Sequence, residues 1–245
     1  MSKRNKAAER AARAAALRAE QERKERHRRN LTIGGIVLGL LVVIGVAYAF
    51  ISSRDTTGED ATPPAGAVDD YGVIVGDAAA PATVTIYEDF QCPVCAAFED
   101  EIGDELDAGI ESGKVNVDYR MVSFLDRASG NDYSSRAMNA AAVVLDTAGV
   151  DAFKAFHDEL FANQPEEGTD GPEDDELIEA AVNAGADEAS IRTAIEEKQF
   201  DQWIKNATDQ MSVDGVNGTP TVFIDGELAG ENPQEYADAI RGVLE

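Results

Sequence analysis

The sequence predicts an α/β domain with an inserted helical subdomain, preceded by a single N-terminal transmembrane helix. Three observations support this prediction. Residues 31–51 are apolar and contain no charged side chain. Residues 82–122 show a strand pattern, a helix pattern and a second strand pattern in succession. A long helical stretch then separates this unit from two short strands and a closing helix, an order typical of mixed α/β domains.

Charge divides the chain into two parts. The formal net charge is -26, but residues 1–30 alone carry +7 and the remainder carries -33. A basic head before an acidic body indicates that the two parts occupy different environments. We expect residues 1–30 to be a basic cytoplasmic tail that sets membrane topology, with no role in binding nucleic acid.

The segment from Leu31 to Ile51 is the predicted transmembrane helix. About 20 apolar residues at about 1.5 Å per residue cross a hydrocarbon core of roughly 30 Å. Arginine and lysine cluster just before this segment, so the positive-inside rule places the N-terminus in the cytoplasm and residues 52–245 outside it. We therefore expect a single-pass protein of the cell membrane with a signal-anchor.

A cleaved signal peptide is the alternative, because Ala47-Tyr48-Ala49 reads as a small-x-small cleavage site. The basic leader is long, however, and the apolar run exceeds a usual signal core. We favour retention as an anchor, and in either case the body of the chain is exported. Residues 52–70 are polar, include Pro63-Pro64 and are predicted to be a linker.

The expected domain covers residues 71–245. Residues 82–89 read as a buried strand, 94–110 as an amphipathic helix and 114–122 as an alternating strand. Two strands joined through a helix favour a parallel pair. Four helices are expected in the middle, as an insertion over about residues 127–205. A strand, the turn Asp225-Gly226, a second strand and a helix over 234–244 close the chain.

Cys92 and Cys95 are the cysteines of this sequence, and they are separated by Pro93 and Val94. A disulfide between them closes a tiny ring, so it would stabilise the fold little. At the first turn of a helix, Cys92 would face unpaired backbone N–H groups and the positive end of the helix dipole, which favour a thiolate. Cysteine pKa values in such places fall to about 3.5–7.5 from about 8.5.

This spacing predicts a redox-active pair in which Cys92 is the nucleophile and Cys95, one turn further on and more buried, resolves the mixed disulfide. Pro93 suits the first helical position because its missing N–H is not needed there. A zinc or iron–sulfur site would require more soft ligands than the exported part contains. We therefore expect no metal and no cofactor, and we interpret His157 as a surface or packed residue and not as a catalyst.

Three stretches carry a family resemblance: Val75-Gly76-Asp77 through Pro81, Glu88 through Cys95, and Gly215 through Thr221. With these the chain resembles the thioredoxin superfamily and, more narrowly, the DsbA-like disulfide oxidoreductases anchored in bacterial envelopes. The resemblance covers residues 70–245 and implies a thioredoxin-like fold and a thiol:disulfide oxidoreductase. It also implies a cis peptide bond between Thr219 and Pro220, beside the cysteines, and a substrate-binding surface made by Pro93, Val94, Thr219 and Pro220.

The sequence departs from the family pattern at two positions. Strongly oxidising members often have histidine where Val94 stands, so part of the thiolate stabilisation is expected to be absent. Thioredoxin has a buried acid six residues before the nucleophile, where this chain has Ile86. Glu88 and Asp89 are the candidate proton relays in its place, and strand alternation is expected to turn one of them inward.

Three functions are compared. The favoured one is oxidation of cysteines in exported polypeptides, followed by reoxidation through a membrane partner, expected to be quinone-linked. A reductase or isomerase would use the same cysteines but would receive electrons from its partner instead of passing them on. The third is a non-catalytic, membrane-tethered binding module with a structural disulfide.

Overall fold

The computed structural model describes residues 58–69 and 71–245. The predicted basic tail and transmembrane segment lie outside these residues. No helix within the described part is both long enough and apolar enough to cross a membrane.

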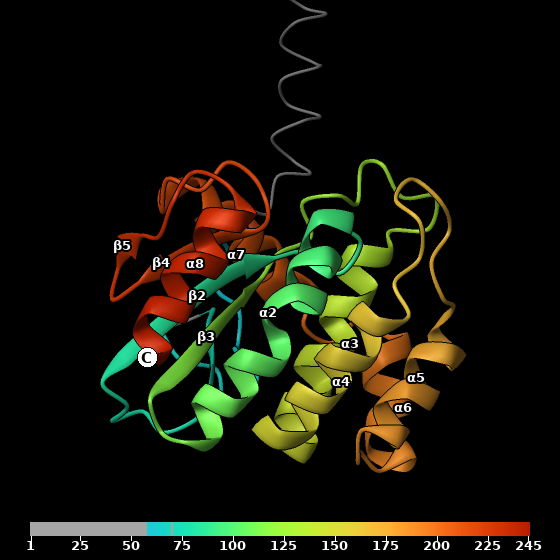
Figure 1. Ribbon diagram of the computed structural model, residues 1–245. Helices are drawn as coiled ribbons and strands as arrows, with labels where there is room; N and C mark the ends of the chain where they lie inside the picture. The colour runs from blue at the N-terminus through green and yellow to red at the C-terminus, as the bar shows by residue number, and fades with distance from the viewer. Residues whose placement is uncertain (1–57, 70) are drawn as a thin grey trace, which may run out of the picture. The chain divides into compact units, whose positions relative to one another are not determined.

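The sheet has five strands in the order β1-β3-β2-β4-β5 (Figure 1). Its members are β1 (Val73–Val75), β2 (Ala82–Glu88), β3 (Val115–Met121), β4 (Thr221–Ile224) and β5 (Glu227–Leu228). β2 and β3 are parallel and are connected by α2 (Pro93–Glu111), as the sequence predicts. β4 lies antiparallel to β2, so the two ends of the domain form one sheet.

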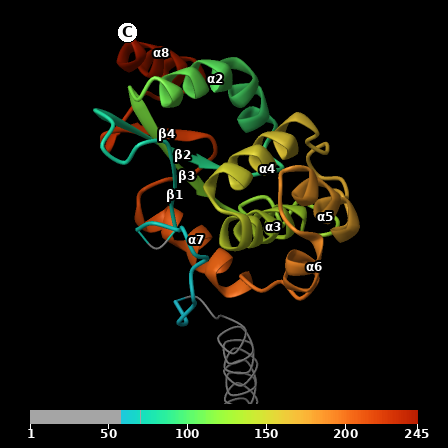
Figure 2. The same ribbon diagram turned by 90° about the horizontal axis from the view of Figure 1, so that it is seen from below.

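Helices cover the sheet on both sides and extend beyond it (Figure 2). α2 and α8 (Pro233–Leu244) pack together on one face, and α7 (Asp201–Val213) packs against β3 on the other. Beside them lie α3 (Tyr133–Ala148), α4 (Val150–Ala162), α5 (Asp174–Asn183) and α6 (Glu188–Glu196). One continuous hydrophobic core joins the sheet to these helices, so the insertion is packed onto the domain that carries the cysteines.

The hairpin of β4 and β5 contains the two-residue turn that the sequence predicts. Asp225 (φ 51°) and Gly226 (φ 83°) both have left-handed backbone conformations, as a two-residue turn between twisted antiparallel strands requires. Asn232 begins α8 by accepting a hydrogen bond from the backbone N–H of Glu235 through its side chain. The predicted strand pair and final helix are thereby confirmed.

The middle of the chain differs from its prediction. Five helices and not four lie between β3 and β4, because residues 197–200 break the predicted fourth helix before α7 begins. The predicted insertion over about residues 127–205 thus contains α3 to α6 and the first residues of α7. The sequence analysis also missed β1, whose three residues are too short for a periodic pattern but pair with β3.

The second half of the predicted linker is bound to the domain. The Asn206 side chain accepts a hydrogen bond from the Gly58 N–H and donates one to the Glu59 carbonyl. Asp146 accepts one from the Ala65 N–H, and Pro64 is buried. The polar composition of residues 52–70 concealed these contacts, so residues 58–69 are not a free spacer.

Candidate active site

The cysteine pair lies where β2 gives way to α2. Cys92 is the N-cap residue of α2, with φ -78° and ψ 112°, and Pro93 occupies the first helical position. The Cys92 carbonyl accepts hydrogen bonds from the N–H groups of Cys95 and Ala96. Cys92 is 5% exposed and Cys95 is fully buried. The predicted order of burial is confirmed, although Cys92 is more enclosed than the sequence suggested.

The surroundings of Cys92 favour its thiolate. The pKa of Cys92 is lowered to about 6, although burial alone would raise it. The largest cause is a hydrogen bond from the Cys95 thiol. The Thr219 side chain and the backbone N–H groups of Cys95 and Val94 also stabilise the thiolate. Both N–H groups belong to the first turn of α2, where the backbone has unused donors. The helix start thus performs the electrostatic role predicted for it.

Cys95 has the opposite environment. Burial, the hydrogen bond to Cys92 and the negative charge of Glu88 raise the pKa of Cys95 well above its ordinary value. One sulfur is therefore held as a thiolate while its neighbour retains a proton. This asymmetry allows Cys92 to exchange disulfides and requires that Cys95 exchange a proton during each cycle.

The segment before β4 lies directly against the pair. The Thr219–Pro220 peptide bond is cis, as the resemblance implied. The thiol of Cys92 donates a hydrogen bond to the Thr219 carbonyl at 3.4 Å. Pro93 and Val94 are exposed beside Cys92, whereas Thr219 is half-buried and Pro220 is buried. The structure therefore brings all four predicted substrate-binding residues together around the cysteines.

Glu88 and Asp89 are both fully buried, although strand alternation was expected to bury one of them. The reason is that β2 ends at Glu88. Asp89 lies beyond the strand and is free of its alternation, so it turns toward the start of the helical insertion. The two acids consequently occupy different environments.

Asp89 is a structural acceptor. Its Oδ1 accepts hydrogen bonds from the Gln91 N–H (2.8 Å) and the Ser134 hydroxyl (2.6 Å), and its Oδ2 accepts one from the Leu125 N–H (2.8 Å). These donors belong to the cysteine loop, to α3 and to the loop after β3. Asp89 thus ties three segments together, and both of its carboxylate oxygens accept hydrogen bonds within the fold.

Glu88 faces His157, a residue that the sequence analysis set aside. Glu88 Oε2 lies 2.9 Å from His157 Nε2, and both side chains are fully buried. The imidazole is packed as expected, with the Tyr119 and Phe161 rings 4.4 and 4.8 Å away between centroids. A histidine among the phenylalanines of α4 was the available signal for this contact, but nothing in the sequence named its partner.

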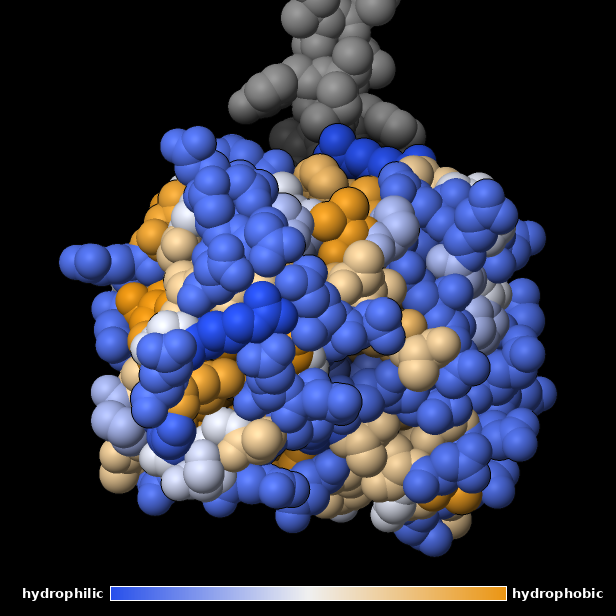
Figure 3. Space-filling view, in the orientation of Figure 1, coloured by the Kyte–Doolittle hydropathy of each residue, from blue (hydrophilic) through white to orange (hydrophobic). Residues whose placement is uncertain are grey.

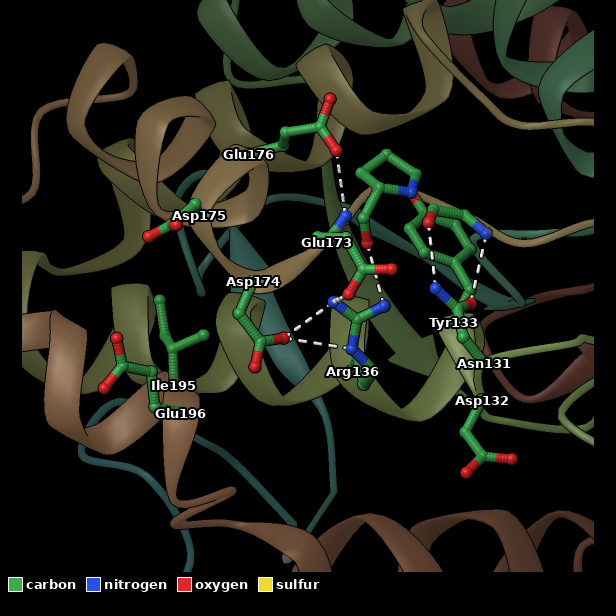
Figure 4. Close-up of polar contacts among 12 residues, drawn as sticks. Asn131, Asp132, Tyr133, Arg136, Glu173, Asp174, Asp175, Glu176, Ile195 and Glu196 are labelled. Carbon is green, nitrogen blue, oxygen red and sulfur yellow. Dashed lines mark hydrogen bonds and ion pairs between the residues drawn. The ribbon is translucent and has the colours of Figure 1, made fainter.

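The loop between α4 and α5 encloses the cysteines on another side. Gln164 Nε2 donates to the Cys92 carbonyl at 2.9 Å, and Gln91 Nε2 donates to the Thr169 carbonyl at 3.0 Å. The far end of the loop is held by Arg136, which bonds Asp174 and the Pro172 carbonyl (Figure 4). The sequence analysis missed this loop because an acidic, Pro- and Gly-containing segment carries no periodic signal.

One set of described side chains has the spacing of metal ligands. Ligand atoms of Glu88, Glu99 and His157 all lie within 4.8 Å of one another. Neither cysteine belongs to this set.

Glu88→Gln should alter the pH dependence of stability. Burial is the main cause that raises the pKa of Glu88 from 4.5 to about 8. The folded chain thus keeps a proton that the unfolded chain releases near pH 4.5, and this contribution to stability is lost as pH rises toward 8. Glutamine has no such proton. The Tm of the variant minus that of the wild type should rise between pH 5 and pH 8.

The measurement is thermal unfolding of the disulfide forms, in which neither thiol titrates. Glu111→Gln is the matched control, because Glu111 is an exposed acid at the other end of α2. Parallel pH profiles for Glu88→Gln and the wild type would contradict the account of Glu88.

Comparison with known proteins supports the geometry. A family model described as Thioredoxin matches residues 69–242. The structure of the reduced disulfide bond oxidoreductase DsbG from Mycobacterium tuberculosis is similar, with a TM-score of 0.60 and 34% identity over 70% of this chain and 86% of that one. Reduced DsbA from the same organism has a TM-score of 0.60 and 32% identity, covering 70% of this chain and 91% of its own.

Two curated proteins have sequences similar to this chain. The probable disulfide bond formation protein D of Bacillus cereus is 25% identical over 84% of this chain and 93% of its own length. The serine/threonine-protein kinase PknE of Mycobacterium tuberculosis is 28% identical over 64% of this chain. The matched stretch spans 29% of the kinase.

Proposed function

This chain belongs to the thioredoxin family and is a DsbA-like thiol–disulfide oxidoreductase, and from this premise we propose that it oxidises cysteine pairs in exported polypeptides. One observation carries the proposed direction: the pKa of Cys92 is lowered to about 6 at the start of α2. A stabilised thiolate favours the reduced enzyme, so the Cys92–Cys95 disulfide becomes a stronger oxidant.

In this proposal a substrate thiolate attacks the Cys92 sulfur and displaces Cys95. A second substrate thiolate then attacks the mixed disulfide and releases Cys92. Cys95 must gain a proton when it leaves, because its pKa is raised by burial. Glu88 is the proposed donor, since burial raises its pKa to about 8 and its carboxylate, once ionised, raises the pKa of Cys95.

The substrate is proposed to lie as an extended chain across Pro93, Val94, Thr219 and Pro220. Val94 is 46% exposed and is among the large apolar side chains on the surface. Apolar contact together with backbone hydrogen bonding at Thr219 would hold many cysteine-containing sequences without selecting one. This breadth suits an enzyme that acts on exported proteins in general.

The proposed location is the outer side of the cell membrane, with Leu31–Ile51 as the anchor. The support is the charge-free length of that segment and the basic residues before it. Reoxidation of the dithiol is proposed to occur through a quinone-linked membrane enzyme, because the anchor would hold both partners at the same membrane.

The reduction potential tests the direction. After equilibration with glutathione buffers, the Cys92–Cys95 couple should have a reduction potential on the oxidising side of the roughly -270 mV of thioredoxin, between that value and the roughly -120 mV of DsbA. The fraction reduced can be counted by alkylation of the full chain and mass spectrometry. A potential near that of thioredoxin would replace the oxidase with a reductase.

Val94→His provides an internal comparison in the same titration. A protonated imidazole at this exposed position would stabilise the Cys92 thiolate further. The potential should therefore move in the oxidising direction. A move in the reducing direction would show that thiolate stabilisation does not set the potential of this enzyme.

A further inference from the structure

The buried active site must exchange protons with water. Cys95, Glu88 and His157 are each fully buried, and the substrate would cover the remaining exposed part of Cys92. A proton must nevertheless reach Cys95 each time the disulfide opens. The chain therefore needs a path that stays open while a polypeptide is bound.

The contacts of His157 define such a path. One ring nitrogen, Nε2, lies 2.9 Å from Glu88 Oε2, and the other, Nδ1, lies 3.0 Å from Asp158 Oδ1. An imidazole can accept a proton at one nitrogen and release one from the other. The Asp158 side chain is 44% exposed. Two hydrogen bonds thus connect a fully buried carboxyl group to a solvent-exposed one.

Asp158 opens into a groove of about 560 Å³ between α2 and α4. The surface is hollowed between these helices in the view of Figure 3. Glu99, Asp104 and Lys154 also line the groove, whereas the four proposed substrate-binding residues do not. The groove lining begins at Ala96 and Ala97, beyond Val94, and extends along α2 to Asp107.

Resting on the proposed function, we propose that His157 positions Glu88 and carries protons between it and the α2–α4 groove, so that Cys95 exchanges its proton away from the substrate surface. The inserted helix α4 would then supply a working part of the redox site. From the sequence, His157 was expected to be a surface or packed residue and not a catalyst.

Transfer of the disulfide to a substrate moves one electron pair and one proton to Cys95. A substrate thiolate forms an S–S bond with Cys92, the Cys92–Cys95 bond breaks, and its electron pair goes to the Cys95 sulfur. That sulfur takes the proton of the Glu88 carboxyl group. His157 Nδ1 takes a proton from groove water beside Asp158, which makes the imidazolium, and Nε2 then gives its proton to the Glu88 carboxylate. When Cys95 attacks a mixed disulfide, the same proton transfers run in the opposite direction and return the proton to the groove.

The charges around His157 favour this transfer. Although burial raises the pKa of Asp158, hydrogen bonds from His157 and Lys154 hold it below its ordinary value. An ionised Asp158 would stabilise the imidazolium formed in passing. The titratable and charged groups that face the ring are Glu88 from β2, Glu99 from α2, Tyr119 from β3, and Asp158 and Lys154 from α4.

His157→Gln in the full chain is the decisive variant. Glutamine can still hydrogen-bond Glu88, but it cannot pass a proton from one side to the other. Loss of a positioned proton-transfer group should slow disulfide transfer to a cysteine peptide, and its reversal, by at least about tenfold. The equilibrium constant with glutathione should stay unchanged, because a relay alters both directions equally. Stopped-flow rates measured from about pH 5 to about pH 9 give the comparison.

Asp158→Asn is the second variant, and it replaces a half-exposed side chain with one of nearly the same shape. It should slow both directions by about threefold, since it removes the charge that supports the imidazolium. Asp104→Asn is the matched control, an exposed acid of the same groove that should leave the rates unchanged.

Wild-type rates at every pH in both His157→Gln and Asp158→Asn would overturn the proposal. A shift of the equilibrium constant as large as the change in rate would also overturn it, because His157 would then act only on the stability of the thiolate. Either result leaves the oxidase proposal intact, since that proposal rests on the potential and on Cys92.

Discussion

Cys92→Ser should reduce the oxidation of a reduced test protein to the uncatalysed rate. The physical reason is that Cys92 carries the stabilised thiolate, with a pKa lowered to about 6, and has the exposed surface of the pair. Cys95 cannot replace it, because Cys95 is fully buried and its pKa is raised. Recovery of activity by the reduced test protein is the measurement.

Cys95→Ser is the matched variant, since it removes the other sulfur and leaves the nucleophile in place. Incubated with a disulfide-bonded peptide, it should accumulate a mixed disulfide at Cys92, because no resolving thiol remains. Nonreducing gels and mass spectrometry would detect this product. If the test protein recovers its activity at the same rate with Cys92→Ser as with the wild type, the non-catalytic binding module is favoured instead.

Asp89→Ala should destabilise the folded domain by about 3–5 kcal/mol, since an unsatisfied buried donor costs about 1–3 kcal/mol. The substitution leaves three donors without their acceptor: the N–H groups of Gln91 and Leu125 and the hydroxyl of Ser134. Because Asp89 is fully buried, water cannot readily replace the lost carboxylate. Urea unfolding of the disulfide form measures the change in the free energy of unfolding.

Asp77→Ala is the control for this loss. Asp77 Oδ1 also accepts a backbone hydrogen bond, from Ala79, but the contact is exposed. Water can satisfy the freed N–H, so the cost should remain within about 1 kcal/mol. Similar losses for the two variants would show that Asp89 does not join the cysteine loop to the insertion.

The reactive pair and the frame that carries it could be predicted from local patterns. The alternation in residues 114–122, the helical spacing after Pro93 and the Asp225-Gly226 turn each specify one element through neighbours in the sequence, and all three are confirmed. The position of Cys92 at a helix start follows from the same local pattern. The family resemblance added the cis Thr219–Pro220 bond, which spacing alone does not imply.

The surroundings of Cys95 could not be predicted in this way. Glu88 and His157 lie sixty-nine residues apart, and Asp89 and Ser134 lie forty-five apart. Periodicity reports which face of an element is apolar, but it does not report which buried polar group meets which.

By itself, then, the sequence determined the two sulfurs, their helix and the strands on either side, because each depends on contacts within a few residues. Only the tertiary structure decided which acid serves structure and which faces the histidine. That choice depends on how the inserted helices pack against the end of β2, where a buried carboxyl group must find its hydrogen-bond partners within the fold.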